Sequence, residues 1–592
     1  MRSTQAGVIH LQGGLFVIPI QLLWHFISVP EIAESTQVAV ATLQGVLSAN
    51  LEFSEAISHM IENSKANAEQ KVLDELVSAL GRSRLSLRKP CMEGTRSAVL
   101  QEIENYIKNI HGHNIIWIRG PPGVGKSALA ASISNRLEEQ GRHVISFRFD
   151  RAECTTITTA ALWGVVASDL AQLYPSFGQQ LIKGNRVHNT SNIDRLFNSL
   201  IETPLSVLDD VPLEELPVIV IDALDECGGF RHDSSAWEDY EGLLRTLKRW
   251  AQADHLKTFK LVIISRLENR IALAFPVSIS THVDIPSGSG VGDNASDDIR
   301  VFLLSRLTAM DVDEEWISKA LDYLVPRAAG IFIWAITAAD FLRMNPEVRF
   351  SMLVSKDNPE GLENLYSLYT TVITTSFGPG LSKEEINAVT SVVGAMIFAM
   401  QPLDDDALIM LHGVKNRNML RFVRRALVSV IDPGPILHFH HLSFEDFLLS
   451  SSFRKDLPML SAIQDRGLHE HRLAVLCLKT MVSPDLHFNM CNLKSSSIMN
   501  ADIPTSVKSV ISPLLSYSSR FWIDHIVHTE CERLIETMRF VMYEKLLFWM
   551  EAMSLLGKAY EVSVALEKAL AWPAIKVWFQ FISRDTGLML PA

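Results

Sequence analysis

The string Gly120-Pro-Pro-Gly-Val-Gly-Lys-Ser127 decides the fold of this chain. It has the pattern G-x-x-x-x-G-K-[S/T]. The apolar run Ile115–Arg119 precedes it, and a segment with helical spacing that ends at Gly141 follows it. A glycine-rich turn between a strand and a helix points backbone N–H groups at phosphate oxygens. The sequence therefore predicts a phosphate-binding loop at the carboxyl edge of a sheet.

Each part of this loop has an expected role. Lys126 is expected to reach the β and γ phosphates, and the Ser127 hydroxyl to ligate Mg²⁺. The residues predicted to bind nucleotide here are Gly120, Pro121, Pro122, Gly123, Val124, Gly125, Lys126, Ser127 and Ala128. A glycine-rich turn without a ligand is the alternative, and it is disfavoured because strand, loop, lysine and serine all fall in register.

Three further apolar runs indicate the rest of the sheet. They are Val144–Phe149, Val218–Ile221 and Leu261–Ser265, and long segments with helical spacing separate them. The runs are continuous rather than alternating, which is typical of strands that are buried on both faces. We therefore predict an α/β P-loop NTPase fold, with a parallel sheet flanked by helices, followed by segments that are almost wholly helical.

Acidic residues follow one of these strands. Asp222 comes directly after Val218–Ile221, and Asp225 and Glu226 lie on the next turn. At the carboxyl edge of the sheet, Asp222 is expected to hold Mg²⁺ together with Ser127. Asp225 or Glu226 is expected to polarise the attacking water as a general base. Capping of a helix N-terminus is the alternative for this pair, and the position after Asp222 favours catalysis.

Arginines follow the next strand, Leu261–Ser265. Arg266 comes directly after it, where a cation can sense the γ-phosphate and stabilise the charge that develops during transfer. Arg270 lies one helical turn later, and a surface ion pair is the favoured interpretation there. The sequence has no N-K-x-D motif of the kind that recognises guanine, so ATP and ADP with Mg²⁺ are the expected cofactors.

The composition limits the partners of the chain. Its 592 residues carry 54 Lys+Arg against 67 Asp+Glu, a net charge of −13, which argues against a broad basic face for nucleic acid. The 6 cysteines are scattered and form no C-x-x-C pair, which fits a reducing compartment. We therefore expect a cytoplasmic protein.

The segment Val8–Val29 is the main candidate for a membrane span or a signal peptide. Gly13, Gly14 and Pro19 interrupt it, whereas a spanning helix needs about 20 mostly apolar residues. No convincing small-residue cleavage site follows it. A second apolar run, Ile331–Leu342, is too short to span. A buried or partner-binding helix is the favoured interpretation of the first segment, and a membrane partner is not expected.

Four strings carry a resemblance to a known family. They are Cys91-Met-Glu-Gly-Thr-Arg96, Asp222-Ala-Leu-Asp-Glu-Cys227, Ala328-Ala-Gly-Ile-Phe-Ile-Trp-Ala335 and His441-Leu-Ser-Phe-Glu-Asp-Phe-Leu448. In these strings the chain resembles the NACHT-type signal-transduction ATPases (STAND class) of mushroom-forming fungi. The NACHT domain that it resembles is of the nephrocystin-3-like N-terminal type. Ala223 stands where many animal relatives have glycine. The match runs roughly from Cys91 to Trp578.

The resemblance implies a switch rather than a metabolic enzyme. ADP would hold a closed form, ATP would open it, and a homo-oligomer would then expose an N-terminal effector to an unknown protein partner. The histidine at the position of His441 is implied to touch the β-phosphate in the closed form, although a packed or capping histidine explains the residue equally well. A metal site at His438, His440 and His441 is disfavoured because no cysteine or carboxylate set accompanies them.

The predicted division of the chain has five parts. They are residues 1–90, a helical region of unknown role; 91–285, the nucleotide-binding NACHT domain; 296–365, a helical lid; 366–460, a winged-helix-like domain; and 465–592, a C-terminal helical domain without repeats. Pro286–Ala295 is predicted to be a linker, and Val428–His438 a short hairpin.

The function predicted from these features is that of a weak ATPase acting as a nucleotide-dependent switch in fungal non-self recognition. The alternative is an interaction scaffold that binds ATP and scarcely hydrolyses it. Members of the family usually carry a repeat array after the helical region, and this sequence has none. A ligand-sensing part is therefore expected to be missing, either truly or because the gene is truncated.

Overall fold

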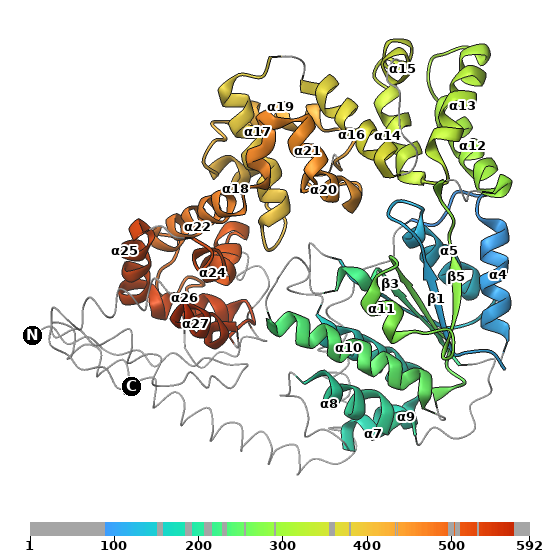
Figure 1. Ribbon diagram of the computed structural model, residues 1–592. Helices are drawn as coiled ribbons and strands as arrows, with labels where there is room; N and C mark the ends of the chain where they lie inside the picture. Colours follow the sequence, from blue (N-terminus) through green and yellow to red (C-terminus); the bar gives the residue numbers. More distant parts are fainter. Residues whose placement is uncertain are drawn as a thin grey trace, which may run out of the picture.

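A parallel sheet lies at the centre of the first half of the computed structural model (Figure 1). The structure describes residues 89–572 apart from 110, 151–157, 184–191, 207–215, 228–233, 254–255, 289–291, 355–361, 378–379, 433, 435, 495–502, 504–509, 530–531 and 560. Within these residues the strand order is β2-β3-β4-β1-β5. The strands are β1 (Ile115–Arg119), β2 (Val144–Arg148), β3 (Val218–Asp222), β4 (Leu261–Ser265) and β5 (Ser280–Asp284).

Both faces of this sheet carry an apolar core. Alternate strand residues point to opposite faces, so that Ile116 and Ile118 join one core whereas Ile115 and Trp117 join the other. The first core is covered by α4 (Ser97–Lys108) and α5 (Lys126–Glu139). The helices on the second face are α6 (Thr159–Leu173), α7 (Pro175–Lys183), α8 (Ile193–Phe197), α10 (Ser234–Gln252) and α11 (Asn269–Ala274). The fold class predicted from continuous apolar runs is confirmed.

The strand β5 is not among the runs that the sequence predicts. Its residues Ser-Thr-His-Val-Asp are mostly polar, and only Ser280 and Val283 are buried. It pairs with β1 alone, at one edge of the sheet, and its other three residues are at least partly exposed. A hydrophobic run is therefore neither required nor present.

Helices α12 to α15 follow the sheet and lie above it in Figure 1. Their bounds are α12 (Asp293–Leu307), α13 (Glu314–Ala328), α14 (Phe332–Leu342) and α15 (Pro346–Val354). The first begins at Asp293, so the predicted linker Pro286–Ala295 is too long at its C-terminal end. Acidic side chains near a helix N-terminus are favourable, which explains why the helix extends back over these polar residues. Ala329 and Gly330, with φ of 44° and 78°, turn the chain from α13 into α14.

The next segment is a group of short helices. They are α16 (Leu362–Phe377), α17 (Lys383–Phe398), α18 (Asp405–Met410), α19 (Arg417–Ala426), α20 (Leu442–Leu448) and α21 (Ser451–Asp456). Between α19 and α20 an isolated antiparallel bridge joins Ile431 to Phe439. The N–H of Asp432 donates to the carbonyl of His438 at 2.8 Å, so the predicted hairpin forms as one short bridge.

The last described helices form the body at the left of Figure 1. They are α22 (Arg466–Val482), α24 (Pro513–Ile526), α25 (Glu532–Phe540), α26 (Leu546–Leu555) and α27 (Glu561–Ala571). Trp522 and Trp549 meet edge to face in this body, with ring centroids 5.4 Å apart. Within the described part of the chain, none of the helices combines the length and the apolar character that crossing a membrane requires. The candidate segment Val8–Val29 lies outside the described residues.

Candidate functional site

The loop Gly120–Ser127 joins β1 to α5, as the sequence predicts. Gly123 and Gly125 have φ of 79° and 92°, in the left-handed region that only glycine enters readily. The carbonyl of Gly123 accepts a hydrogen bond of 3.0 Å from the N–H of Ile333, at the start of α14. The loop is therefore fixed on one side to the sheet and on the other to the helices beyond it.

Lys126 is the partly buried cation of this loop. Its Nζ donates to the carbonyls of Gly120 and Pro121, both at 2.8 Å. Burial lowers the pKa of Lys126 to about 8, and the negative charge of Asp225 partly opposes that shift. An anion at this position would stabilise the charged ammonium, so the lysine is suited to hold a phosphate.

Ser127 and Asp222 are brought together from α5 and β3. The Ser127 hydroxyl donates to Oδ1 of Asp222 at 3.1 Å, and Asp222 is fully buried. A hydroxyl and a carboxylate are hard oxygen donors, and Mg²⁺ in phosphate sites is bound by one or two such protein groups, with phosphates and waters completing its shell. The residues present therefore fit a magnesium ion that accompanies a nucleotide.

The turn after β3 carries the two other acidic residues. Ala223 adopts φ 57°, a left-handed conformation that is costly for a residue with a Cβ. This conformation begins the short turn that holds Asp225 and Glu226, and both of them line the same cavity as Lys126. Ala223 stands where the resemblance in sequence gives many relatives a glycine, and its backbone explains that preference.

Arg266 connects this turn with a distant helix. Its backbone N–H donates to Oδ1 of Asp225 at 3.0 Å, and its Nε lies 3.3 Å from Oδ2 of the same residue. Its Nη1 donates to Oδ2 of Asp446, on α20, at 2.7 Å. The Asp225 side chain is 3% exposed and that of Arg266 is 20% exposed, so the pair is only partly screened by solvent. Arg270 instead pairs with Glu241 at the surface, as the sequence suggested.

His441 caps α20 and also lines the cavity. Its Nδ1 accepts a hydrogen bond of 3.0 Å from the N–H of Ser443, and its ring lies against the hydroxyl of the same serine at 2.8 Å. Because Nδ1 accepts, the neutral ring carries its proton on Nε2. The two interpretations of this histidine, as a cap and as a nucleotide contact, are therefore compatible.

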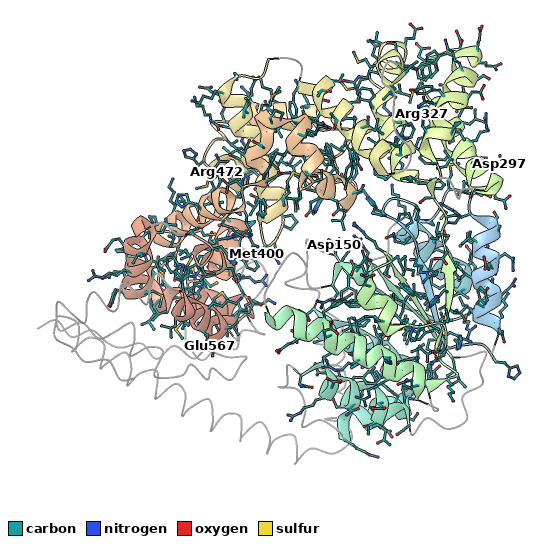
Figure 2. The ribbon with its side chains drawn as sticks, in the orientation of Figure 1. Asp150, Asp297, Arg327, Met400, Arg472 and Glu567 are labelled. Carbon is teal, nitrogen blue, oxygen red and sulfur yellow. The ribbon has the colours of Figure 1, made fainter. Side chains whose placement is uncertain are left out.

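These residues surround one cavity of about 790 Å³ between the sheet, α14, α17 and α20. Asp150 and Met400, which Figure 2 labels, both line it. Of the predicted site residues, those that line it are Pro122, Gly123, Gly125, Lys126, Ser127, Ala128, Asp225, Glu226, Arg266 and His441. Gly120, Pro121, Val124 and Asp222 are not among its lining residues. The volume is that of an ordinary small-molecule site.

Three residues of this region escape prediction from the sequence. Arg148 is the last residue of β2, Asp150 follows this strand, and both residues line the cavity. Because β2 pairs with β3, these two residues lie at the same edge of the sheet as Asp222. Knowledge of the strand order would therefore have identified them as candidate site residues. Arg96 is almost fully buried and donates from Nη2 to the carbonyl of Val124 at 2.8 Å. The sequence placed Arg96 in a family string without showing that it contacts the phosphate loop.

One known family matches part of the chain. The family described as "Nephrocystin 3, N-terminal" matches residues 94–266, which are 173 of the 592 residues. No curated protein matches the sequence.

Two solved structures show weaker likeness. A STAND protein with a tetratricopeptide repeat sensor from Pyrococcus horikoshii is 12% identical, with a TM-score of 0.33, over 84% of this chain and 81% of that one. C. elegans PCH-2 is 13% identical, with a TM-score of 0.23, over 49% of this chain and 71% of that one. TM-scores of this size indicate no more than a local likeness. Residues 94–266 thus form a P-loop NTPase module similar to the N-terminal part of nephrocystin 3.

Proposed function

We propose that this chain is a nucleotide-dependent switch of the NACHT type that binds Mg-ATP and hydrolyses it slowly. The observation that supports this most strongly is the position of Arg266. This residue contacts Asp225, on the turn after β3, and Asp446, on a helix that closes the cavity. The guanidinium of Arg266 thereby connects the proposed nucleotide site to α20.

The residues of the loop are proposed to hold the nucleotide. Lys126 neutralises the phosphates, while Ser127 and Asp222 offer oxygen ligands to Mg²⁺. Bound ATP supplies the phosphoryl group that is transferred to water. Asp225 is engaged by Arg266, so Glu226 is proposed as the base that accepts the proton of the attacking water. Arg266 stabilises the negative charge that develops on the transferred group.

The switch follows from competition for Arg266. A γ-phosphate beside Arg266 is a second anion that competes with Asp446 for the guanidinium, whereas a diphosphate does not reach as far. Loss of the contact with Asp446 would release α20, and His441 at the start of the same helix would leave the cavity with it. ADP is therefore proposed to favour the closed form and ATP the open form.

The remaining parts of the proposal concern the whole chain. The domains are proposed to be 1–90, 91–285, 296–365, 366–460 and 465–592, with 366–460 a winged-helix-like unit. The ATP form is proposed to assemble into a homo-oligomer that presents an unknown effector partner with a new surface, in the cytoplasm and without nucleic acid. A role in fungal non-self recognition rests on the resemblance in sequence alone.

The experiment measures the size of the purified chain by small-angle X-ray scattering and size-exclusion chromatography, with Mg-ADP and with Mg-ATP. The ATP sample is expected to be larger, and Lys126→Ala is expected to bind neither nucleotide. Asp446→Asn should resemble the ATP form even with ADP. Asp406→Asn, which removes an exposed partner of Arg417 on the same group of helices, is the matched control and should behave like the wild type. Identical sizes in both nucleotides would contradict the switch.

A scaffold that binds ATP without turning it over is the second candidate. It is favoured by one observation: the Asp225 carboxylate already contacts Arg266 through both of its oxygens. Phosphate release by the wild type and by Glu226→Gln separates the two. Turnover that falls at least tenfold in Glu226→Gln supports the hydrolysing switch, and negligible turnover in both proteins supports the scaffold.

A further inference from the structure

A second concave site lies apart from the nucleotide cavity, between α15, α16 and α19. Its volume is about 480 Å³, and it shares no lining residue with the larger cavity. Its lining residues are Met344, Arg349, Thr375, Ser376, Asn418, Arg421, Phe422, Arg425, Ala426, Val428 and Ser429. We call this site the arginine groove, because three of these side chains are arginines. No described residue that lines it is acidic.

The arginines of α19 differ in whether they pair with a carboxylate. Arg417 pairs with Asp406, and Arg424 pairs with Asp405. Arg421 and Arg425 are exposed and face the groove four residues apart, on the same side of the helix. Among the residues that the structure describes, Arg421 bonds the neutral side chain of Asn418, and neither Arg421 nor Arg425 makes an ion pair. The two residues without a carboxylate partner are therefore the two that line the groove.

Arg349, on α15, is the third arginine that lines the groove. Its Nη1 donates to the carbonyl of Phe341 at 2.7 Å, and its guanidinium stacks over the ring of Phe341 at 4.6 Å. These contacts fix the orientation of the charge without neutralising it. A third cation from a different helix is thus held in place in the same groove as Arg421 and Arg425.

The position of Arg425 in the last turn of α19 does not explain this arrangement. A cation there interacts favourably with the helix dipole, which is a gain of a few tenths of a kcal/mol to about 1 kcal/mol for each residue. The dipole accounts for Arg425 alone. It gives no reason for Arg421, which lies one turn earlier, or for Arg349, which belongs to another helix. Repulsion among the three is unfavourable unless an anion occupies the space between them.

We propose that the arginine groove binds a compact ligand bearing several phosphate groups. Guanidinium groups recognise phosphate through paired hydrogen bonds, and the hydroxyls of Thr375 and Ser376 add donors on the same wall. The groove is the size of a small-molecule site, and its three arginines line this one space of about 480 Å³. These features fit a small polyphosphate, free or as a lipid headgroup, better than a nucleic acid duplex.

The experiment titrates the full chain with inositol hexakisphosphate as the probe. Binding is measured by isothermal titration calorimetry, with excess Mg-ADP present to occupy the nucleotide site. The probe is expected to bind, and Arg421→Gln/Arg425→Gln to weaken binding by at least about tenfold for each arginine removed. Arg417→Gln removes the same charge from the same helix outside the groove, and its affinity should stay within about twofold of the wild type. The single variants Arg421→Gln and Arg425→Gln provide the same test if the double variant does not fold.

A further arm excludes the nucleotide site, because a phosphate-binding loop also attracts polyphosphates. Binding that persists in Lys126→Ala and is lost in the double variant supports the proposal. Binding lost in Lys126→Ala and kept in the double variant overturns it, as does the absence of binding to the wild type. Tighter binding of a duplex DNA than of the probe also overturns it.

Sedimentation with lipid vesicles tests whether the ligand is a lipid headgroup or a soluble polyphosphate. Sedimentation of the chain with vesicles containing phosphatidylinositol 4,5-bisphosphate, and not with phosphatidylcholine alone, assigns the groove to a lipid headgroup. Binding of the free probe without sedimentation assigns it to a soluble ligand. Both results support the proposed chemistry, provided that the double variant loses the effect.

Discussion

Arg266 and Asp446 lie 180 residues apart in the chain and meet at 2.7 Å across the nucleotide cavity. The contact joins the strand that ends beside the phosphate loop to a helix on the far side of the cavity. Neither side chain is fully exposed, at 20% and 25%, so the interaction is stronger than a typical surface pair and weaker than a buried one. This intermediate strength suits a contact that must form and break.

A double-mutant cycle measures this interaction. Arg266→Ala, Asp446→Asn and the double variant are compared with the wild type by chemical unfolding in the presence of Mg-ADP. We expect a coupling free energy of about 1–2 kcal/mol, between the ranges for exposed and buried pairs. The same cycle with Arg270 and Glu241, an exposed pair, should give less than about 0.5 kcal/mol. Equal coupling free energies in the two cycles would mean that the contact between Arg266 and Asp446 is no stronger than an exposed ion pair.

The affinity for ADP should depend on pH through Lys126. Burial lowers the pKa of this lysine to about 8, and a bound phosphate raises it again because the anion stabilises the ammonium. Above a pH of about 8, binding therefore requires proton uptake, and the affinity should fall by up to about tenfold per pH unit. Calorimetry from neutral to alkaline pH tests this. Lys126→Arg keeps its charge throughout, so it should show a flat profile, and a flat wild-type profile would exclude this role for the lysine.

Gly123→Ala is expected to loosen the contact between the phosphate loop and α14. An added Cβ would lie 2.1 Å from Cγ2 of Ile333, which is β-branched and has little freedom to move. Gly141→Ala is the matched control, since Gly141 has the same φ of 79° and no atom within 4 Å of the added Cβ. Both variants should lose about 1–2 kcal/mol through backbone strain. Gly123→Ala should lose about 1–3 kcal/mol more, measured by thermal unfolding.

The steric origin of that extra loss has its own check. Ile333→Ala makes room for the added methyl group, so Gly123→Ala/Ile333→Ala should lose less than the sum of its two single variants. A strictly additive result would assign the loss to the loop backbone instead of the contact with α14.

Tyr517→Phe is expected to destabilise the C-terminal helices. The Tyr517 hydroxyl accepts from the N–H of Met400 at 3.1 Å and meets Nε2 of His525 at 2.7 Å, while Nδ1 of that histidine contacts Glu470 at 2.7 Å. Removing the hydroxyl takes this hydrogen bond from the buried His525 and from the partly buried N–H of Met400, at a cost of about 1–3 kcal/mol in thermal unfolding. Tyr106→Phe, whose bond to Glu102 is solvent-exposed, should change stability by less than about 0.5 kcal/mol.

The phosphate loop and the sheet could be predicted because their signals are local. Lys126 and Ser127 belong to one continuous string, and β1, β3 and β4 are apolar up to their last residue, whereas β2 also carries Ser146 and Arg148. The strand β5 lacks that signal because only two of its residues, Ser280 and Val283, are buried. Local chemistry is visible in a sequence when all of the groups it needs are close together along the chain.

The contacts that close the cavity have no such signal. Asp446 was part of a recognised string, yet nothing along the chain indicates that it pairs with Arg266. Arg96 has the same difficulty, because its contact with Val124 depends on a left-handed backbone at φ 59° that no neighbouring residue requires. These relationships arise from tertiary packing and are seen only when the structure brings the segments together.

The hydrogen bond from Ile333 to the carbonyl of Gly123 involves backbone atoms only. Any amino acid except proline supplies the same N–H at position 333, whereas position 123 needs glycine because its φ is 79° and an added Cβ would lie 2.1 Å from Ile333. Relatives of this protein would then preserve the attachment of the phosphate loop to α14 while their sequences diverge around it. A search for such relatives should compare backbone geometry at this position and not the identity of residue 333.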